Sequence, residues 1–187
     1  MNEIKLHLGC DKRYLTGYVH IDLADYPHID YKSNINNLTM FNDNSVNLIY
    51  ASHVLEYFDR FEVEEVIKEW ARVLKTKGIL RLAVPNFQEL VNVYNNYKDL
   101  SFILGPLYGR WEVTDSDIVL YHKTVYDYNS LAEILTSSGF TNIRTWDWEE
   151  VFIDENEGFD DYSQAYIPHM DKDNGKLISL NIEAEKL

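Results

Sequence analysis

Short apolar runs rich in β-branched residues alternate along the chain with longer segments whose apolar positions recur at helical spacing. This alternation predicts an α/β fold, a mostly parallel sheet covered by helices, because parallel strands need a crossover connection between them. The predicted strands occupy residues 4–8, 18–22, 29–31, 47–51, 79–84, 141–148 and 176–185.

The segment 59–75 has the clearest helical pattern. Asp59, followed by Glu62 three residues later, is typical of a helix start, and Gly78 after a lysine-rich turn marks the expected stop. Charged residues fall away from the apolar face, so the helix is expected to pack on the sheet. That face contains Val63, Val66, Ile67, Trp70, Val73 and Leu74.

Two further segments predict helices. One begins after Asn86 as a cap and runs to Lys98. The other begins near Ser130, with Glu133 completing a capping box, and ends at Gly139. The first of these two is expected to bury Phe87, Leu90, Val91 and Tyr94.

An acidic, tyrosine-bearing stretch, residues 149–176, separates the last two predicted strands. It is too long for a plain hairpin loop, and long loops of this kind often serve a functional site. Asn174 and Gly175 near its end favour a tight turn, so residues 164–170 are expected to pair back onto the final strand.

Composition limits the kind of protein this is. The 187 residues, 45% of them hydrophobic, suit a single domain spanning 1–187 with a full core. The formal net charge of −14 argues against nucleic acid as a partner, because such proteins need a basic face to displace counterions from phosphates. A small substrate, or a neutral or cationic one, fits this charge better.

The sequence carries no sign of export or of membrane insertion. Its single cysteine cannot form an internal disulfide, and no basic segment followed by an apolar run opens the chain. No apolar stretch approaches the roughly 20 residues that a membrane helix requires. We therefore expect a cytoplasmic protein without a membrane partner, and leave open whether it forms an oligomer.

Polar residues stand at the carboxyl ends of the first four predicted strands, the edge where open parallel sheets bind ligands. A glycine there lets the backbone approach a ligand, and an acidic residue closing the second strand is placed to hold ribose hydroxyls. An amide beside an apolar residue suits an adenine ring. In chain order these residues are Gly9, Cys10 and Asp11, then Asp22, then Asn34 and Ile35, then Ser52 and His53 with Glu56 and Tyr57.

Two longer stretches carry a family resemblance. The stretch "FNDNSVNLIYASHVLEYF" resembles the pattern "F.D.SFD.I....LEH", and "RVLKTKGILRLAVPN" resembles "R.LKPGG.L....P". Both patterns are typical of the class I S-adenosylmethionine-dependent methyltransferases, particularly the small type 11-like branch. "LGCD" and "SGFTNI" are similar to two further turns of that family. The resemblance implies a Rossmann-like seven-stranded sheet whose last strand is antiparallel, with helices on both faces.

The resemblance also implies a set of cofactor contacts. Leu8, Gly9 and Cys10 would line the methionine part of S-adenosylmethionine, and Asp22 would hold its ribose. The chain departs from the family at three positions. Asp11 stands where the family usually has glycine, Asn34 where it often has aspartate, and Tyr57 where it usually has histidine. The full set of expected cofactor contacts is Leu8, Gly9, Cys10, Asp11, Asp22, Leu23, Asn34, Ile35, Ser52 and His53.

The connection from Gly9 to Tyr18 is too short for a full crossover helix, so only one helical turn is expected there. S-adenosylmethionine has no phosphate and depends less on a helix N-terminus than a dinucleotide does. Lys12 or Arg13 would then meet its carboxylate and Asp11 its ammonium group.

The acceptor side is expected to use residues between the fifth and sixth strands, in a lid-like insertion over about 99–128, with a second over 149–176. His53 is the first candidate for a general base and His122 the second, because neutral imidazole is available near physiological pH. His169 ranks third. Glu56, Tyr57, Trp111, Tyr121 and His122 are the expected acceptor contacts, beside the aromatic Tyr108 and Tyr126.

Several residues also have ordinary structural explanations. Glu56 could simply favour the start of a helix, and His53 could be a packing residue. Tyr94 and Lys98 have the spacing used by short-chain dehydrogenases, but a glycine-rich dinucleotide motif is absent. "DKDNG" lacks the later glutamate of a calcium loop, so no metal is expected.

The sequence thus favours a methyltransferase acting on a small acceptor, with a hydroxyl of a sugar or other metabolite preferred. Two alternatives stay open at this point. One is a methyltransferase-like binding or partner subunit without catalysis, and the other is a nicotinamide-dependent oxidoreductase.

Overall fold

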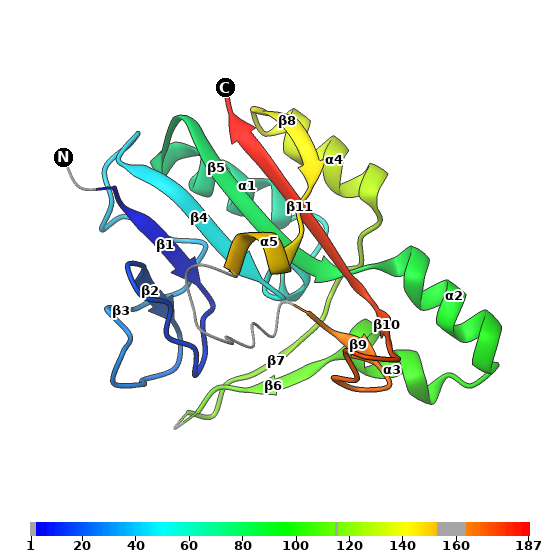
Figure 1. The fold of residues 1–187 in the computed structure, drawn as a ribbon. Helices are drawn as coiled ribbons and strands as arrows, with labels where there is room; N and C mark the ends of the chain where they lie inside the picture. The colour runs from blue at the N-terminus through cyan, green and yellow to red at the C-terminus, as the bar shows by residue number, and fades with distance from the viewer. Residues whose placement is uncertain (1–2, 115, 153–163) are drawn as a thin grey trace.

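The computed structural model describes residues 3–114, 116–152 and 164–187. Seven strands form one sheet in the order β3-β2-β1-β4-β5-β11-β8 (Figure 1). All neighbours are parallel except β11, which runs antiparallel to both β5 and β8. The strands are β1 (Lys5–Leu8), β2 (Val19–Asp22), β3 (Tyr31–Lys32), β4 (Val46–Ser52), β5 (Leu74–Pro85), β8 (Phe140–Thr145) and β11 (Ser179–Lys186).

This arrangement confirms the predicted fold class, an α/β Rossmann-like sheet with an antiparallel last strand. Four predicted strands differ from the observed ones by more than one residue at an end, and one of them is 79–84, which is extended to Leu74 in β5. The third predicted strand begins at Tyr31, the segment 141–148 divides between β8 and the helix α5 (Trp148–Phe152), and the segment 176–185 divides into β10 (Lys176–Leu177) and β11.

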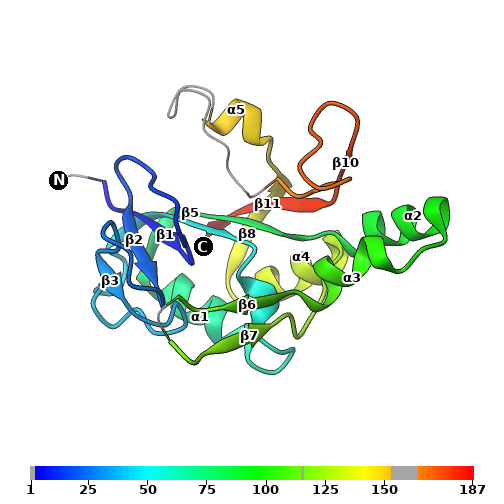
Figure 2. The same cartoon turned by 90° about the horizontal axis from the view of Figure 1, so that it is seen from below.

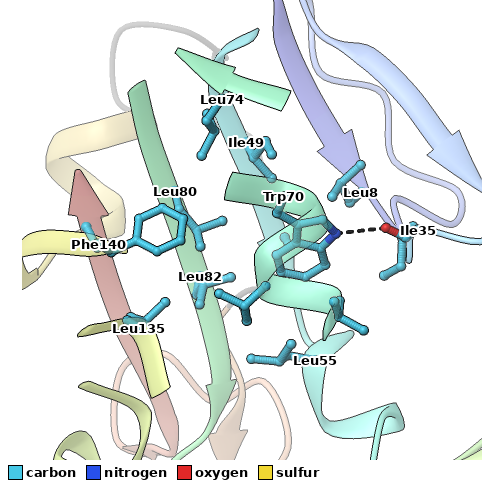
Figure 3. Packing of buried hydrophobic residues seen from close by; sticks show 14 of the residues in the cluster. Leu8, Ile35, Ile49, Leu55, Trp70, Leu74, Leu80, Leu82, Leu135 and Phe140 are labelled. Atoms are coloured by element: carbon cyan, nitrogen blue, oxygen red, sulfur yellow. Dashed lines mark hydrogen bonds between the residues drawn. The ribbon is translucent and has the colours of Figure 1, made fainter. Parts of the chain in front are cut away.

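Helices lie on both sides of the sheet. Figure 2 shows α1 (Val63–Val73) and α4 (Tyr128–Ser137) on one side and α5 on the other. The side with α1 and α4 holds the main core, in which the indole of Trp70 is fully buried and donates from Nε1 to the carbonyl of Ile35 at 2.8 Å (Figure 3). This bond ties α1 to the loop after β3.

The face of β1 and β2 that points away from the main core carries two buried histidines. Strand alternation directs Leu6, Leu8 and Ile21 into the main core and leaves the His7 and His20 side chains for the opposite face. The His20 ring lies 5.6 Å from that of His7 and 5.4 Å from that of His28. No helix is described between β1 and β2, and Leu15 and Tyr18 help to cover this face instead.

The start of α1 confirms the predicted signal. Asp59 accepts through Oδ1 from the Glu62 amide at 3.1 Å, and Glu62 accepts through Oε2 from the Asp59 amide at 2.9 Å. The predicted stop at Gly78 was wrong, because the helix ends at Val73 and Leu74 is already extended. Leu74 pairs with Val46 of β4, so sheet pairing ends the helix before Lys75 and Lys77.

The helix α2 (Phe87–Tyr97) is capped by Asn86, as predicted, whose side chain accepts from the Gln88 amide at 3.2 Å. Its predicted apolar face was wrong in part: Leu90 is buried, but Phe87 and Tyr94 are exposed by 41% and 37%, and the other buried residue is Val93, which was not predicted. The reason is that α2 projects from the sheet and packs on α3 (Ser101–Tyr108) and the segment around β9 (Tyr166–Ile167) (Figure 1).

The start of α4 differs from the prediction. Asp127 is the cap, and Ser130 completes the capping box in place of Glu133. The predicted end is confirmed, because the helix stops at Ser137 and Gly139 adopts a φ of +90°.

Two small hairpins complete the fold. β6 (Arg110–Glu112) pairs with β7 (Val119–Tyr121) within the predicted insertion 99–128. β9 pairs with β10 through a turn in which the Gly175 amide donates to the carbonyl of Asp171 at 2.9 Å, which confirms the hairpin expected there. In the predicted insertion 149–176, residues 153–163 lie outside the described residues. Among the described helices, none combines the length and apolar character needed to cross a bilayer.

Candidate active site

A pocket of about 390 Å³ opens at the carboxyl ends of β1, β2 and β4. This is the edge at which the sequence predicted a ligand site, and the volume lies within the range of small-molecule pockets. All the predicted cofactor contacts line it except Leu8, which is fully buried beneath the turn.

The turn after β1 allows the pocket to form. Gly9 adopts a φ of +64°, and a Cβ atom there would lie 2.2 Å from Cγ1 of Val54. Only glycine therefore fits between β1 and the segment after β4. The Gly9 amide donates to the carbonyl of Ile21 at 2.8 Å, which holds the turn beside β2.

Two carboxylates meet at this turn. Asp22 is buried and accepts from the amides of Asp11 and Ala24, both at 2.8 Å. Burial raises the pKa of Asp22, and these two amide bonds oppose the shift. Asp11 stands in the left-handed region at a φ of 46°, and its buried Oδ1 has no hydrogen-bond partner among the described residues. The turn thus presents an unsatisfied carboxylate oxygen in a lining residue of the pocket.

The remaining cofactor-side residues differ in how firmly they are held. Ile35 is fixed by its carbonyl bond to Trp70, whereas Asn34 is exposed. The Ser52 hydroxyl is buried without a hydrogen-bond partner in the described part of the chain. Burial, and next the Asp22 carboxylate, raise the pKa of the Cys10 thiol, so this cysteine is not an activated nucleophile.

The two candidate bases lie on either side of a buried carboxylate. Nδ1 of His53 is 3.3 Å from Oε1 of Glu56, and Nε2 of His122 is 3.8 Å from the same atom. Nε2 of His53 also lies 2.9 Å from the Ser179 hydroxyl. Of these three residues only His53 lines the pocket, so Glu56 and His122 stand behind the surface that an acceptor would meet.

The far end of the pocket is aromatic. Tyr57 and Trp111, two of the expected acceptor contacts, line it with ring centroids 6.5 Å apart. Burial, then the carboxylates of Glu56 and Asp11, raise the pKa of Tyr57, so its hydroxyl stays protonated. Tyr121 is half exposed and does not line the pocket; its hydroxyl accepts from Nε of Arg110 at 3.2 Å.

Several lining residues were not predicted. Phe58 and Glu62 follow Tyr57 in the chain, and Leu120 and Lys123 flank two residues that were predicted. Lys123 reaches Glu62 at 3.2 Å, which places an ion pair between the hairpin segment and the start of α1. The unpredicted lining residues are Asn36, Val54, Phe58, Glu62, Leu120 and Lys123. Proximity to predicted residues was the only signal that the sequence offered for them.

Other candidates lie elsewhere. His169 is exposed on the hairpin formed by β9 and β10. Lys98 lies 5.9 Å from the ring centroid of Tyr94 on α2, and neither residue lines the pocket. The dehydrogenase-like spacing of this pair therefore has no connection with the site.

Comparison with known proteins gives a consistent result. Residues 15–82 match the family model described as "Methyltransferase domain". No curated protein matches the sequence.

Solved structures show the same fold. A SAM-dependent methyltransferase from Archaeoglobus fulgidus is 17% identical, with coverage of 98% of this chain and 86% of that one and a TM-score of 0.59. A SAM-dependent methyltransferase from Methanosarcina mazei is 16% identical, with coverage of 100% and 94% and a TM-score of 0.54. The 1,6-didemethyltoxoflavin-N1-methyltransferase of Burkholderia thailandensis is 11% identical, with coverage of 98% and 70% and a TM-score of 0.54. At these identities the likeness establishes the fold.

The sheet order, with its antiparallel strand β11 between β5 and β8, and the pocket at the strand ends define a class I methyltransferase fold. Residues 15–82 match a methyltransferase domain model, and the fold over the whole chain is that of S-adenosylmethionine-dependent methyltransferases. Both comparisons favour the methyltransferase hypothesis over the oxidoreductase alternative.

Proposed function

We propose that the chain works as one methyltransferase domain that methylates a hydroxyl of a small acceptor, such as a sugar. The observation that carries this proposal is the form of the pocket. One end is lined by the turn after β1 and by Asp22, and the other by Tyr57 and Trp111. A cofactor and a small ring-shaped acceptor would meet between these ends.

The residues of the first end fit the cofactor. S-adenosylmethionine supplies a methyl group on a positively charged sulfur, and also carries an ammonium group and ribose hydroxyls. The unsatisfied Oδ1 of Asp11 suits the ammonium group, and the second lone pairs of the Asp22 oxygens suit the ribose hydroxyls. We assign adenine to the side of Asn34 and Ile35, and the methionine part to Gly9, Cys10 and Ser52.

The second end would hold the acceptor. The indole of Trp111 offers a flat apolar surface, and the ion pair between Glu62 and Lys123 offers hydrogen bonds to hydroxyl groups. Methyl transfer needs the acceptor atom held in line with the methyl group, so positioning is the main contribution of these residues. Tyr121 does not line the pocket, and we assign it to the hairpin formed by β6 and β7.

His53 is the proposed general base, because it is the histidine that lines the pocket. A hydroxyl acceptor must lose its proton during transfer, and an imidazole nitrogen can accept it. Nε2 of His53 faces the Ser179 hydroxyl. To take a proton from the acceptor, this nitrogen must leave Ser179 and contact the acceptor hydroxyl instead. Neither Glu56 nor His122 is assigned direct contact with the acceptor.

Calorimetry tests the cofactor half of the proposal. The protein is titrated with S-adenosylmethionine, S-adenosylhomocysteine and NAD, and binding is expected for the first two only. Asp11→Asn keeps the side-chain shape but removes the charge, so affinity for both ligands should fall about tenfold. Asp25→Asn, at an exposed aspartate paired with Lys32, serves as the matched control and should bind like the parent protein. An Asp11→Asn variant that binds equally well would contradict the assignment of Asp11.

Methyl-labelled cofactor tests the acceptor half. The protein is incubated with neutral sugars and with amino sugars of the same ring size, and the labelled atom is identified by NMR. Transfer to oxygen is expected. Transfer confined to nitrogen, with binding of the cofactor intact, would overturn the hydroxyl assignment and leave the cofactor half standing.

A further inference from the structure

Glu56 is the most deeply buried carboxylate beside the pocket. Its side chain is 0% exposed, and neither oxygen makes a hydrogen bond of normal geometry with the described residues. An isolated buried carboxylate is strongly unfavourable, and the groups nearest to it are the ones placed to compensate its charge. Those groups are the imidazoles of His53 and His122.

The hydrogen bonds around His53 fix where its proton lies. Ser179 Oγ accepts from the Ala165 amide at 2.9 Å, which leaves the serine hydroxyl free to donate to Nε2 of His53. Nδ1 of His53 faces the Glu56 carboxylate and therefore carries the proton. This neutral form directs the proton on Nδ1 toward the carboxylate and leaves Nε2 as an acceptor.

The surroundings of His122 lead to a different form. Nδ1 of His122 lies 2.8 Å from the carbonyl of Pro106, which can only accept, so Nδ1 carries a proton. If Nε2 carried none, its lone pair would face the Glu56 carboxylate across 3.8 Å. A second proton on Nε2 removes this repulsion and creates an ion pair.

We propose that Glu56 is a positioning residue that pairs with a doubly protonated His122 and orients His53 with Nε2 as its acceptor nitrogen. The cluster then has no net charge: one carboxylate, one imidazolium and one neutral imidazole. The other titratable groups that face it are Tyr57, whose ring lies 4.7 Å from that of His122, and Tyr126. Burial and the Glu56 carboxylate raise the pKa of both hydroxyls, so they add no charge.

Glu56 also connects the pocket to the β6–β7 hairpin and the residues that follow it, 122–124. The Glu56 carbonyl accepts from the amides of Lys123 and Thr124 at 2.7 and 3.3 Å. The His122 amide donates to the carbonyl of Gly109 at 3.0 Å, where a Cβ atom would collide with the His122 ring. The backbone and side chain of Glu56 thus hold the residues after β7 against the short 3-10 helix η1 (Leu55–Tyr57) that follows β4 beside the pocket. The catalytic meaning of this arrangement rests on the proposed function, because only a base needs a defined acceptor nitrogen.

The test is NMR of protein labelled with ¹⁵N in its histidines, with S-adenosylhomocysteine bound, and His53→Gln and His122→Asn variants to assign the signals. At pH 7 both nitrogens of His122 are expected to be protonated, and His53 is expected to carry its proton on Nδ1. An unprotonated Nε2 of His122 in the parent protein overturns the proposal, whatever any Glu56 variant does.

Glu56→Gln separates positioning by charge from simple packing. The carboxamide oxygen, in the place of Oε1, can still accept from Nδ1 of His53 but carries no charge, so the fold and the His53 signal should be retained. Nε2 of His122 should change from protonated to unprotonated. Glu64→Gln, on the exposed face of α1, is the matched control and should leave both histidines unchanged. An unchanged His122 in Glu56→Gln would contradict the role of Glu56. Failure of the proposed function would instead appear as absent cofactor binding in calorimetry, a separate result.

Discussion

The histidines on the β1–β2 face make the stability of the protein depend on pH. His7 and His20 are each exposed by only 1%. Burial lowers the pKa of both, and for His7 the neighbouring His20, Arg13 and His28 lower it further. For His20, the hydrogen bond and charge of Asp30 oppose the shift. His7 is therefore the stronger of the two contributors.

The direction of the effect follows from proton linkage. When a folded-state pKa lies below that of the unfolded chain, the unfolded chain takes up more protons as the pH falls. The free energy of unfolding is then highest above pH ~6.5, the unfolded value, and decreases as the pH falls below it. For each histidine that stays neutral in the folded protein, the free energy of unfolding decreases by about 1.4 kcal/mol per pH unit in this range. Between pH 7 and pH 5 the decrease is about 2 kcal/mol.

The substitution His7→Phe isolates this contribution. A phenyl ring keeps the contacts with Tyr50, whose ring lies 5.1 Å from that of His7, and cannot take up a proton. Urea unfolding at pH 5, 6 and 7 gives the free energy of unfolding for each protein. The loss of stability from pH 7 to pH 5 should be about 2 kcal/mol smaller in His7→Phe than in the parent.

His169→Gln provides the control, because His169 is exposed and its removal should leave the pH dependence unchanged. The reasoning is refuted if His7→Phe and the parent lose the same free energy over this pH range. A changed urea m-value would show that the substitution had altered the unfolded or folded state instead.

Three further substitutions test the fold and the pocket. Trp70→Phe removes the indole bond to the Ile35 carbonyl and part of the core volume, so urea unfolding should show a loss of about 2–3 kcal/mol; a loss below about 0.5 kcal/mol would contradict this. Gly9→Ala forces a Cβ atom to 2.2 Å from Val54, and calorimetry should show S-adenosylmethionine binding weakened by at least about tenfold; unchanged affinity would mean that the turn does not shape the pocket. Asp127→Ala removes the cap of α4, which accepts from the Ser130 amide at 2.8 Å, and should lower the free energy of unfolding by about 1 kcal/mol. An equal loss in Asn129→Ala would show that the cap is not the cause.

Where a signal lay within a few neighbouring residues, the sequence was sufficient. The reciprocal bonds of Asp59 and Glu62, the Asn86 cap and the turn at Gly175 all join residues at most four positions apart. The strand pattern likewise placed the pocket, because every parallel strand ends at the same edge of the sheet. The errors arose where distant segments meet: pairing with Val46 ended α1 early, and the projection of α2 exposed Phe87.

The candidate site divides in the same way. The strand-end residues Asp11 and Asp22 follow from local sequence, and the structure confirms that they line one pocket. The position of Glu56 between two histidines, and of Lys123 beside Glu62, depends on the hairpin segment folding back against the start of α1. The sequence alone thus determined most strands of the sheet, the helix starts near Asp59 and Asn86, and the edge that holds the site, because these follow from local backbone preferences. Only the tertiary structure decided which side chains face the pocket and which stand behind it, since that depends on contacts between residues far apart in the chain.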